Sequence, residues 1–208
     1  MSFIVAIDGP SAAGKGTLAR AISTEYGFRH LDTGMLYRVT AALAIDRGIE
    51  PDLAVREITL EDFSHPDLRS PKISQEASRI SAIPAVRAAL LTHQQEFARS
   101  GFGVVLDGRD IGTVIAPEAE VKLFVTASPE ARAKRRHLEL ELTGATATYT
   151  EVLSEMKIRD ERDSSRSASP LRVAHDATVI DTTDITHEEA TEMVFRLVDR
   201  ALMRKSAA

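Results

Sequence analysis

Residues 3–17 read Phe3-Ile4-Val5-Ala6-Ile7-Asp8-Gly9-Pro10-Ser11-Ala12-Ala13-Gly14-Lys15-Gly16-Thr17. The first five are apolar, as in a strand buried on both faces, and the rest match the Gly-x-x-x-x-Gly-Lys pattern of a phosphate-binding loop. Glycines let the backbone wrap closely so that successive N–H groups point at phosphate oxygens, and a following helix adds the positive end of its dipole. The stretch therefore predicts a buried strand, a phosphate loop and a helix in direct succession.

The loop has the side chains expected of a nucleotide site. We expect all of residues 9–17 to bind nucleotide phosphates, with Lys15 as a mobile charge on the β- and γ-phosphates. The residue after the lysine, usually Ser or Thr in such loops, is Gly16, and the hydroxyl follows one position later on Thr17. We therefore expect ATP and Mg²⁺ here, with Thr17 contacting the metal partly through water.

Composition narrows the class of protein. The chain has 208 residues, 43% of them hydrophobic, which is enough for one domain with small insertions. A net charge of −5 argues against a dedicated nucleic-acid or membrane-surface protein. With no cysteine there is no thiolate catalysis, and the six histidines lack metal-ligand spacing. No apolar run is long enough to cross a bilayer, so we expect a cytoplasmic protein that binds neither membranes nor nucleic acids.

Short β-branched runs alternate with helical patterns along most of the chain. Strands are predicted at 3–7, 28–31, 104–106, 121–125 and 178–180, and helices from 14, over 35–47 and 84–97, from 129, and from 187 onward. The last helix begins with a capping box of Thr186 and Glu189. Its apolar stripe, which we expect to pack in the core, is Ala190, Met193, Val194, Leu197, Val198 and Ala201. Alternation of this kind favours a parallel sheet flanked by helices.

Two stretches stand apart from this scaffold. Residues 49–83 are polar, carry three prolines and show mixed periodicity, as expected of an inserted substrate arm. Residues 163–170 are rich in serine and lack apolar anchors, which predicts a mobile loop. We therefore expect a single domain over 1–208, with a core of 1–48, 84–150 and 171–208, an arm at about 49–83 and a lid at about 151–170.

Two motifs at predicted strand ends offer a place for a second substrate. Thr33 and Arg38 lie at the mouth and first turns of a helix that follows a strand, where ligands bind in open α/β sheets. The turn Asp107-Gly108-Arg109-Asp110 also follows a strand, and Asp107 is placed to bind Mg²⁺ directly or through water. Both motifs would face the phosphate loop.

A third group consists of arginines beside the serine-rich stretch. Arg159 and Arg162 are three residues apart on one helical face, with Asp163 and Arg166 just beyond. Phosphoryl transfer needs cations around the migrating group, and Arg pairs with phosphate oxygens in a way that Lys cannot. We interpret this segment as a closing lid that excludes water. We interpret the preceding basic cluster mainly as surface charge, with one member able to touch ATP: Arg132, Lys134, Arg135 and Arg136.

The motifs together resemble the bacterial-type cytidylate kinases in order and spacing, over nearly the whole chain. They are residues 9–17, Asp32-Thr33-Gly34 through Tyr37-Arg38, Ile83-Pro84-Ala85-Val86-Arg87, Asp107-Gly108-Arg109-Asp110-Ile111-Gly112-Thr113 and Arg159-Asp160-Glu161-Arg162-Asp163. The resemblance implies a P-loop NTPase-type three-layer sandwich with a five-stranded parallel sheet, a short arm for the nucleoside monophosphate and a lid. It implies transfer of the γ-phosphoryl of ATP to CMP or dCMP by a monomer.

The resemblance also implies roles for individual residues. The residues facing the cytosine would be Thr33, Ser78, Arg87 and Asp110. Arg38 and Arg109 would bind the acceptor phosphate, and Asp163 the sugar hydroxyls. Lys15, Arg159 and Arg166, together with Arg109, would act as the catalytic cations around the transferring phosphate. A carboxylate suits the amino donor of cytosine, and arginine or a hydroxyl suits its acceptors, whereas uracil reverses that pattern.

The chain departs from the family pattern at three places. Thr33 stands where the family has serine, Ser164 stands where it often has arginine, and the arm between Arg38 and Ser78 is shorter than the long form, which inserts a small sheet. From the residues alone, two other interpretations stay open. One is a small P-loop kinase with a different nucleotide or a small metabolite as acceptor, and the other is an ATP-binding regulator. The arginines in excess of what ATP requires favour a kinase.

Overall fold

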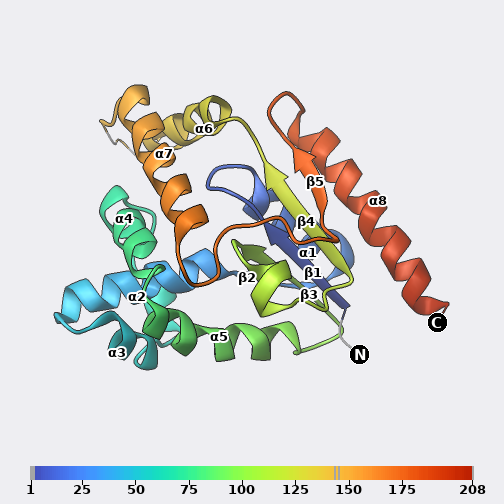
Figure 1. The fold of residues 1–208 in the computed structure, drawn as a ribbon, viewed down its shortest axis with the longest axis horizontal. Coiled ribbons are helices and arrows are strands. Elements are labelled where there is room, and N and C mark those ends of the chain that lie inside the picture. Colours follow the sequence, from blue (N-terminus) through green and yellow to red (C-terminus); the bar gives the residue numbers. More distant parts are fainter. Residues whose placement is uncertain (1–2, 143, 145, 208) are drawn as a thin grey trace.

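The computed structural model describes residues 3–142, 144 and 146–207. Its centre is a five-stranded parallel sheet with the strand order β2-β3-β1-β4-β5 (Figure 1). The strands are β1 (Phe3–Asp8), β2 (Arg29–Asp32), β3 (Gly103–Gly108), β4 (Val121–Thr126) and β5 (Thr178–Asp181). The predicted α/β fold is confirmed, and each predicted strand lies within two residues of its observed bounds.

The central strands are buried on both faces. Every residue of β1 and β3 is buried, which explains why their sequences are apolar throughout rather than alternating. Along β1, Val5 and Ile7 belong to the core on one face of the sheet, while Ile4 and Ala6 belong to the core on the other. The chain therefore builds two separate apolar layers against a single sheet.

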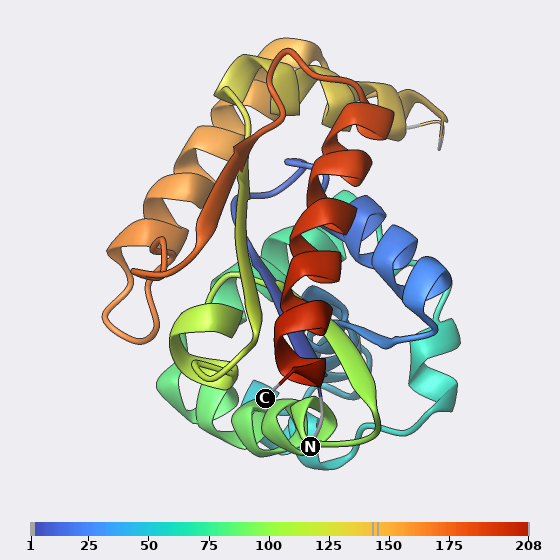
Figure 2. The ribbon, with the colours of Figure 1, turned by 90° about the vertical axis from the view of Figure 1, so that its right-hand side faces the viewer.

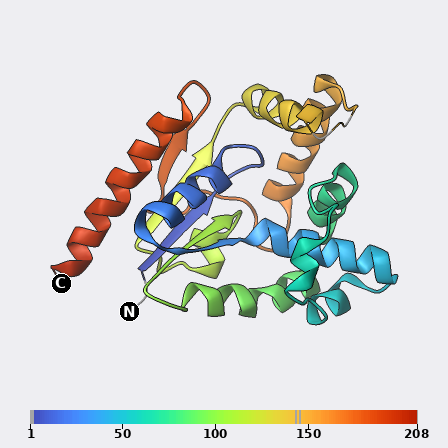
Figure 3. The same cartoon turned by 180° about the vertical axis from the view of Figure 1, so that it is seen from behind.

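Helices cover both faces. On one face lie α1 (Lys15–Tyr26) and α8 (His187–Ser206), side by side in Figures 2 and 3. The core on the opposite face includes side chains of α5 (Pro84–Ala98) and of a short π-helix, η2 (Ile111–Ile115). The three-layer arrangement places the phosphate loop, which joins β1 to α1, at the carboxyl edge of the sheet. This is the edge at which open α/β sheets bind ligands.

Two helical groups project beyond that edge and face each other in Figure 1. The first comprises α2 (Thr33–Arg47), α3 (Pro51–Arg56), the 3₁₀ turn η1 (Glu61–Ser64) and α4 (Pro71–Ile80). Of these, α2, α3 and α4 share an apolar core of their own that also includes Val86 and Leu90 of α5. The second comprises α6 (Pro129–Leu142) and α7 (Tyr149–Ser165), which pack on each other. Residues 49–83, all described, contain no strand. The bounds of the arm and the lid as functional units stay predictions.

Two local expectations were wrong. The predicted loop at 163–170 begins later, because α7 continues through Ser165 and its last turns are supported by Ser164 Oγ, which donates to the Asp160 carbonyl at 2.7 Å. Serine can satisfy backbone acceptors one turn back and is therefore compatible with a helix end.

The predicted capping box of α8 is confirmed. Met193 of its apolar stripe is, however, 43% exposed, because the buried face is narrower than the stripe.

No helix in the described part of the chain is both long and apolar enough to cross a membrane.

Gly103 should be intolerant of a side chain. A Cβ atom there would lie 2.2 Å from the ring of Phe28, which itself packs against Phe3 and Tyr26 with ring centroids 5.6 Å apart in each pair. Gly103→Ala should therefore lower the free energy of unfolding in urea by about 1–3 kcal/mol, as overpacking does. Met203→Ala, at an exposed position of α8, should change it by less than about 0.5 kcal/mol. A Gly103→Ala variant as stable as the parent would contradict this packing.

Candidate active site

A strongly polar cleft of about 230 Å³ lies at the carboxyl edge of the sheet, between the two helical groups. Its basic lining residues are Lys15, Arg20, Arg38, Arg69, Arg87, Arg109, Arg136, Arg159 and Arg166. Its acidic ones are Asp32, Asp107, Asp110, Glu139 and Asp163. Since the basic groups outnumber the acidic ones by nine to five, the cleft is suited to ligands that carry several negative charges.

The phosphate loop forms one end of this cleft. Gly9 has a φ of 143° and would place a Cβ only 1.9 Å from the Val125 carbonyl oxygen, so only glycine fits where the loop leaves β1. Lys15 is buried and its Nζ donates to the Pro10 carbonyl at 2.7 Å. Of the residues predicted to bind phosphates, those lining the cleft are Ser11, Ala12, Gly14, Lys15, Gly16 and Thr17, whereas Gly9, Pro10 and Ala13 are buried beneath it.

Lys15 lies among other cations. Burial, together with the charges of Arg109 and Arg159, lowers the pKa of Lys15 to about 7, although Asp107 acts in the opposite direction. Burial and the two guanidinium groups disfavour the charged form of Lys15. An anionic ligand beside the amine would favour that form. The end of the cleft at the loop is therefore a prepared anion site.

Asp107 lies beside the loop, at the end of β3. Its Oδ1 lies 2.7 Å from His30 Nε2, and its Oδ2 would be 3.8 Å from a Cβ built on Gly16. Thr17 is exposed, and its hydroxyl accepts from Arg20 at 3.4 Å. Mg²⁺ commonly binds through one or two protein oxygens while substrate phosphates and waters complete its shell, so Asp107 and Thr17 fit such a role. Sequence reasoning missed His30, because nothing in the spacing of the histidines pointed to Asp107.

At the opposite end, Asp110 forms a buried charge cluster with two arginines. Arg87 Nη2 donates to Asp110 Oδ2, and Arg166 Nη2 lies 3.9 Å from Asp110 Oδ1. Arg87 also donates to the Ser81 carbonyl and lies over the ring of Tyr37. These additional partners offset part of the cost of burying the ion pair of Arg87 and Asp110.

Thr33 and Ser78 lie along the same wall of the cleft. Thr33 Oγ1 donates to the Asp107 carbonyl at 2.8 Å, and Ser78 Oγ accepts from Arg162 Nη1 at 2.8 Å. The second contact joins α7 to α4, across the cleft from one helical group to the other. Arg162 was noted in the sequence only as one of a row of arginines, because a contact between residues 84 positions apart leaves no local signal.

Asp163 pairs with two arginines in the middle of the cleft. Arg109 Nε donates to Asp163 Oδ2 at 2.8 Å, and Arg159 Nε lies 4.0 Å from the same oxygen. Although burial works against ionisation, these two arginines hold the pKa of Asp163 below its ordinary value. Burial and the charge of Arg109 lower the pKa of Arg159 to about 9. Arg159 also donates to Ser11 Oγ at 3.4 Å, so α7 contacts the phosphate loop.

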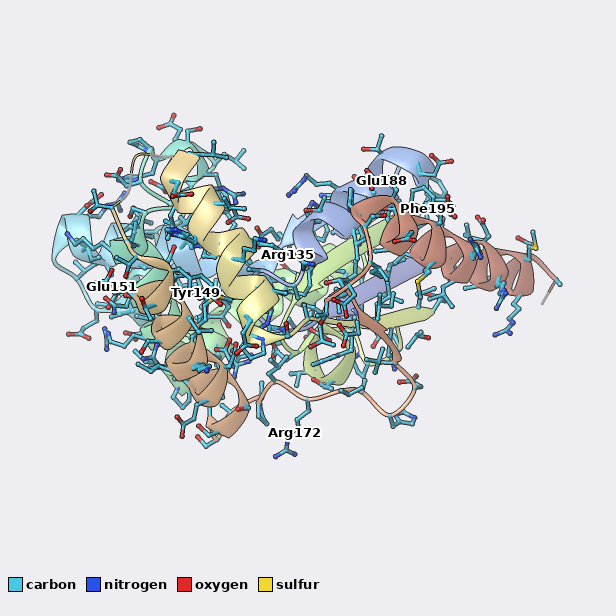
Figure 4. All side chains as sticks on the ribbon, turned by 90° about the horizontal axis from the view of Figure 1, so that it is seen from above. Arg135, Tyr149, Glu151, Arg172, Glu188 and Phe195 are labelled. Atoms are coloured by element: carbon cyan, nitrogen blue, oxygen red, sulfur yellow. The ribbon has the colours of Figure 1, made fainter. Side chains whose placement is uncertain are left out.

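Arg38 lies between these groups, and its Nη1 donates to the Leu68 carbonyl at 3.1 Å. Two further cleft arginines, Arg20 and Arg69, had no predicted site role. Arg172, beyond Arg166, is not part of the cleft and points away from the body of the protein in Figure 4.

Within the basic cluster on α6, Lys134 is exposed as expected, and Arg136 lines the cleft, where one member was expected to reach ATP. The interpretation as surface charge was wrong for Arg132. Arg132 is only 3% exposed and donates to both oxygens of Asp160, at 3.2 and 2.7 Å, and to the Ala127 carbonyl. Arg135, labelled in Figure 4, donates to Thr182 Oγ1 at 3.0 Å. A helical run of basic residues gives no indication of which of them will face a neighbouring acid.

The structure thus brings every predicted substrate-binding, catalytic and metal-contacting side chain to one cleft. The phosphate loop and Lys15 lie at one end, and Asp110 with Arg87 at the other. Arg38, Arg109 and Arg159 lie between them. An arrangement of this kind can hold two phosphorylated ligands with their phosphates facing each other. The roles of the individual residues stay predictions.

Comparison with known proteins agrees with this geometry. The sequence pattern of the family described as cytidylate kinase matches residues 5–59 and 54–200. A cytidylate kinase of Cereibacter sphaeroides is 52% identical over 199 residues, covering 96% of each chain, and one of Rhizobium meliloti is 50% identical over 211 residues, covering 99% of this chain and all of the relative.

Solved structures resemble the fold at low identity. An uncharacterised protein from Eubacterium ventriosum has a TM-score of 0.57 and 16% identity over 96% of this chain and 99% of its own. TT1252 from Thermus thermophilus has a TM-score of 0.52 and 18% identity over 97% and 98%. These likenesses concern the fold alone. The family match and the two relatives, half identical over nearly their whole length, show that this chain belongs to the cytidylate kinase family.

Proposed function

We propose that this protein transfers the γ-phosphoryl group of ATP to CMP or dCMP, giving ADP and CDP or dCDP. As a member of the cytidylate kinase family, the chain is a phosphotransferase that acts on a nucleoside monophosphate. One observation carries the more detailed proposal. A phosphate loop and a second set of arginines, buried around Asp110 and half-buried around Asp163, share a single cleft. A site for ATP alone would not need the second set.

The cluster at Asp110 is our candidate for base recognition. The Asp110 carboxylate can accept from the amino group of cytosine, while Arg87 and the hydroxyls of Thr33 and Ser78 can donate to its ring nitrogen and carbonyl. Uracil presents the reversed pattern and would leave buried groups without partners, at a cost of about 1–3 kcal/mol for each. Selectivity would then follow from the donor and acceptor pattern of this wall.

The cations between the two ends are our candidates for the phosphates. Arg38 and Arg109 would bind the acceptor phosphate, and Asp163 would accept from the sugar hydroxyls. Lys15, at the phosphate loop, and Arg159 would surround the transferring group. Arg166 would join them on leaving the Asp110 cluster, where its Nη2 lies 3.9 Å from Asp110 Oδ1. In such a transfer the protein aligns the two phosphates and stabilises negative charge, so no side chain need act as a nucleophile. Mg²⁺, held at Asp107 and Thr17, would neutralise charge on the β- and γ-phosphates when bound.

Closure of the arm and lid around both substrates would exclude water from the transferring group. The contacts of α7 with Ser11 and Ser78 support this part of the proposal, because they already join the lid helix to both ends of the cleft. The monomeric state and the cytoplasmic location stay predictions.

The acceptor is tested by measuring ADP release from ATP with CMP, dCMP, UMP, AMP, GMP and shikimate as acceptors. We expect CMP and dCMP to be phosphorylated with kcat/KM at least about 100-fold above that of UMP, because two or more mismatched hydrogen bonds each cost about 1–3 kcal/mol. A preference for any acceptor outside the cytidine pair would overturn the proposal.

Asp110→Ala should selectively reduce activity toward cytosine. It removes the acceptor for the amino group and leaves Arg87 unpaired, so kcat/KM for CMP should fall by about 100-fold or more, while that for UMP should change much less. Steady-state kinetics with both acceptors check this. Glu192→Ala, at an exposed position on α8, is the control and should behave as the parent. An equal loss with every base would remove Asp110 from base recognition.

Binding of ATP should take up a proton at pH 8. In the free protein the pKa of Lys15 is about 7, so above that pH the amine is mostly neutral. Phosphates next to it favour the charged form and raise this pKa, so the complex should gain about one proton at pH 8. Titration calorimetry in two buffers of different ionisation enthalpy measures the uptake. It should disappear in Lys15→Met and should be smaller at pH 6, where Lys15 is already charged. No uptake by the parent protein at pH 8 would show that Lys15 is charged in the empty site.

A further inference from the structure

Asp8 is a buried acid for which the predicted site offered no role. It ends β1, directly before the phosphate loop, and is 4% exposed. Its Oδ1 accepts from the backbone N–H of Ile111 at 2.7 Å, and its Oδ2 accepts from that of Gly112 at 2.8 Å. One carboxylate thus satisfies two successive backbone donors 103 and 104 positions along the chain.

Those two donors follow Asp110 immediately. They are the first N–H groups of η2, and the first donors of any helix lack partners within it. The carbonyl of Asp110 in turn accepts from Val114 and Ile115, at 2.9 and 3.1 Å. The backbone that follows Asp110 is therefore held at two points. The Asp110 carbonyl accepts hydrogen bonds from residues of η2, and the next two N–H groups donate to Asp8.

Asp8 holds this turn at an electrostatic cost. Burial raises the pKa of Asp8 to about 6, the two N–H bonds oppose that rise, and the neighbouring charge of Asp110 adds to it. The contact is also close. A Cβ on Gly112 would lie 3.2 Å from the Lys122 stem and 3.5 Å from Asp8 Oδ2. The glycine gives the carboxylate room to approach the backbone.

We propose that Asp8 is a positioning residue for base recognition, which fixes the turn that carries Asp110 so that the Asp110 carboxylate stays paired with Arg87 and aimed at the cytosine amino group. This inference rests on the proposed function of Asp110. Asp8 also precedes Gly9 directly, but pairing of β1 with β3 and β4 holds the backbone at Asp8, so its side chain positions the turn at Asp110 rather than the phosphate loop.

The test is Asp8→Asn, assayed with CMP and with UMP at saturating ATP. The amide keeps one acceptor but presents an NH₂ group to the second backbone N–H, so the turn must shift. KM for CMP should rise by about tenfold or more, as expected when one buried donor is left unpaired. The ratio of kcat/KM for CMP to that for UMP should fall by a similar factor, while KM for ATP should stay within about twofold. An unchanged CMP to UMP ratio would overturn the proposal.

A purely structural role is excluded by two controls. Val198→Ala, in the core beneath α8, should lower the melting temperature without changing the CMP to UMP ratio. The double variant Asp8→Asn/Asp110→Ala should have the same ratio as Asp110→Ala alone, because Asp8 acts through Asp110. A further loss of selectivity in the double variant would show that Asp8 acts by another route and would overturn the proposal.

The two variants test the roles of Asp110 and Asp8 separately. If Asp110→Ala keeps the parent ratio, the assignment of Asp110 fails, and the role of Asp8 fails with it. If Asp110→Ala loses selectivity and Asp8→Asn does not, only the role of Asp8 fails. Should Asp8→Asn not fold, Asp8→Ser, whose hydroxyl can accept from one of the two N–H groups, is expected to show the same loss of selectivity, and its retention would count against the proposal.

Discussion

The structure depends on holding many positive charges close together in one cleft, where Lys15, Arg87 and Arg166 are buried. Nine basic side chains line one cleft with only five acids among them, and burial together with the neighbouring arginine charges lowers the pKa values of Lys15 and Arg159. Such a cluster is unfavourable by itself. Asp110 and Asp163 reduce the cost by pairing with arginines on several elements at once. Phosphates would neutralise the remaining excess of positive charge, so this excess favours the binding of anionic ligands.

The apolar cores that stabilise the fold lie apart from the carboxyl edge of the sheet, where the charged cleft lies. Two apolar layers on the sheet and a third core among α2, α4 and α5 carry the packing, so the carboxyl edge need contribute little to stability. The acids at that edge act as cross-links. Asp163 joins α7 to the turn after β3, Asp160 joins α7 to α6, and Asp107 joins β3 to β2 through His30. Each link holds a cation or a carboxylate oxygen in place rather than adding to the core.

Features that are local in sequence were predictable, and contacts between distant residues were not. The run before Gly9, the phosphate loop and the turn at Asp107 identify strand, loop and helix because each is contiguous, and they indicate the sheet edge that carries the site. The pairing of His30 with Asp107 or of Arg132 with Asp160 depends on how elements pack, which no periodicity encodes. The helical end of the serine-rich stretch was missed for a different reason, since serine suits loops and helix ends equally.

The contact between Ser78 and Arg162 shows how selectivity can arise without strong binding. Ser78 is buried, and in this structure its hydroxyl accepts from Arg162 instead of remaining unpaired. On the proposed assignment, an entering cytosine would exchange that hydrogen bond for one of its own, so a matched base gains little from Ser78. A mismatched base would break the same contact without replacing it. The wall would therefore discriminate mainly by penalising the wrong pattern, and the affinity would come from the phosphates, which every nucleotide shares.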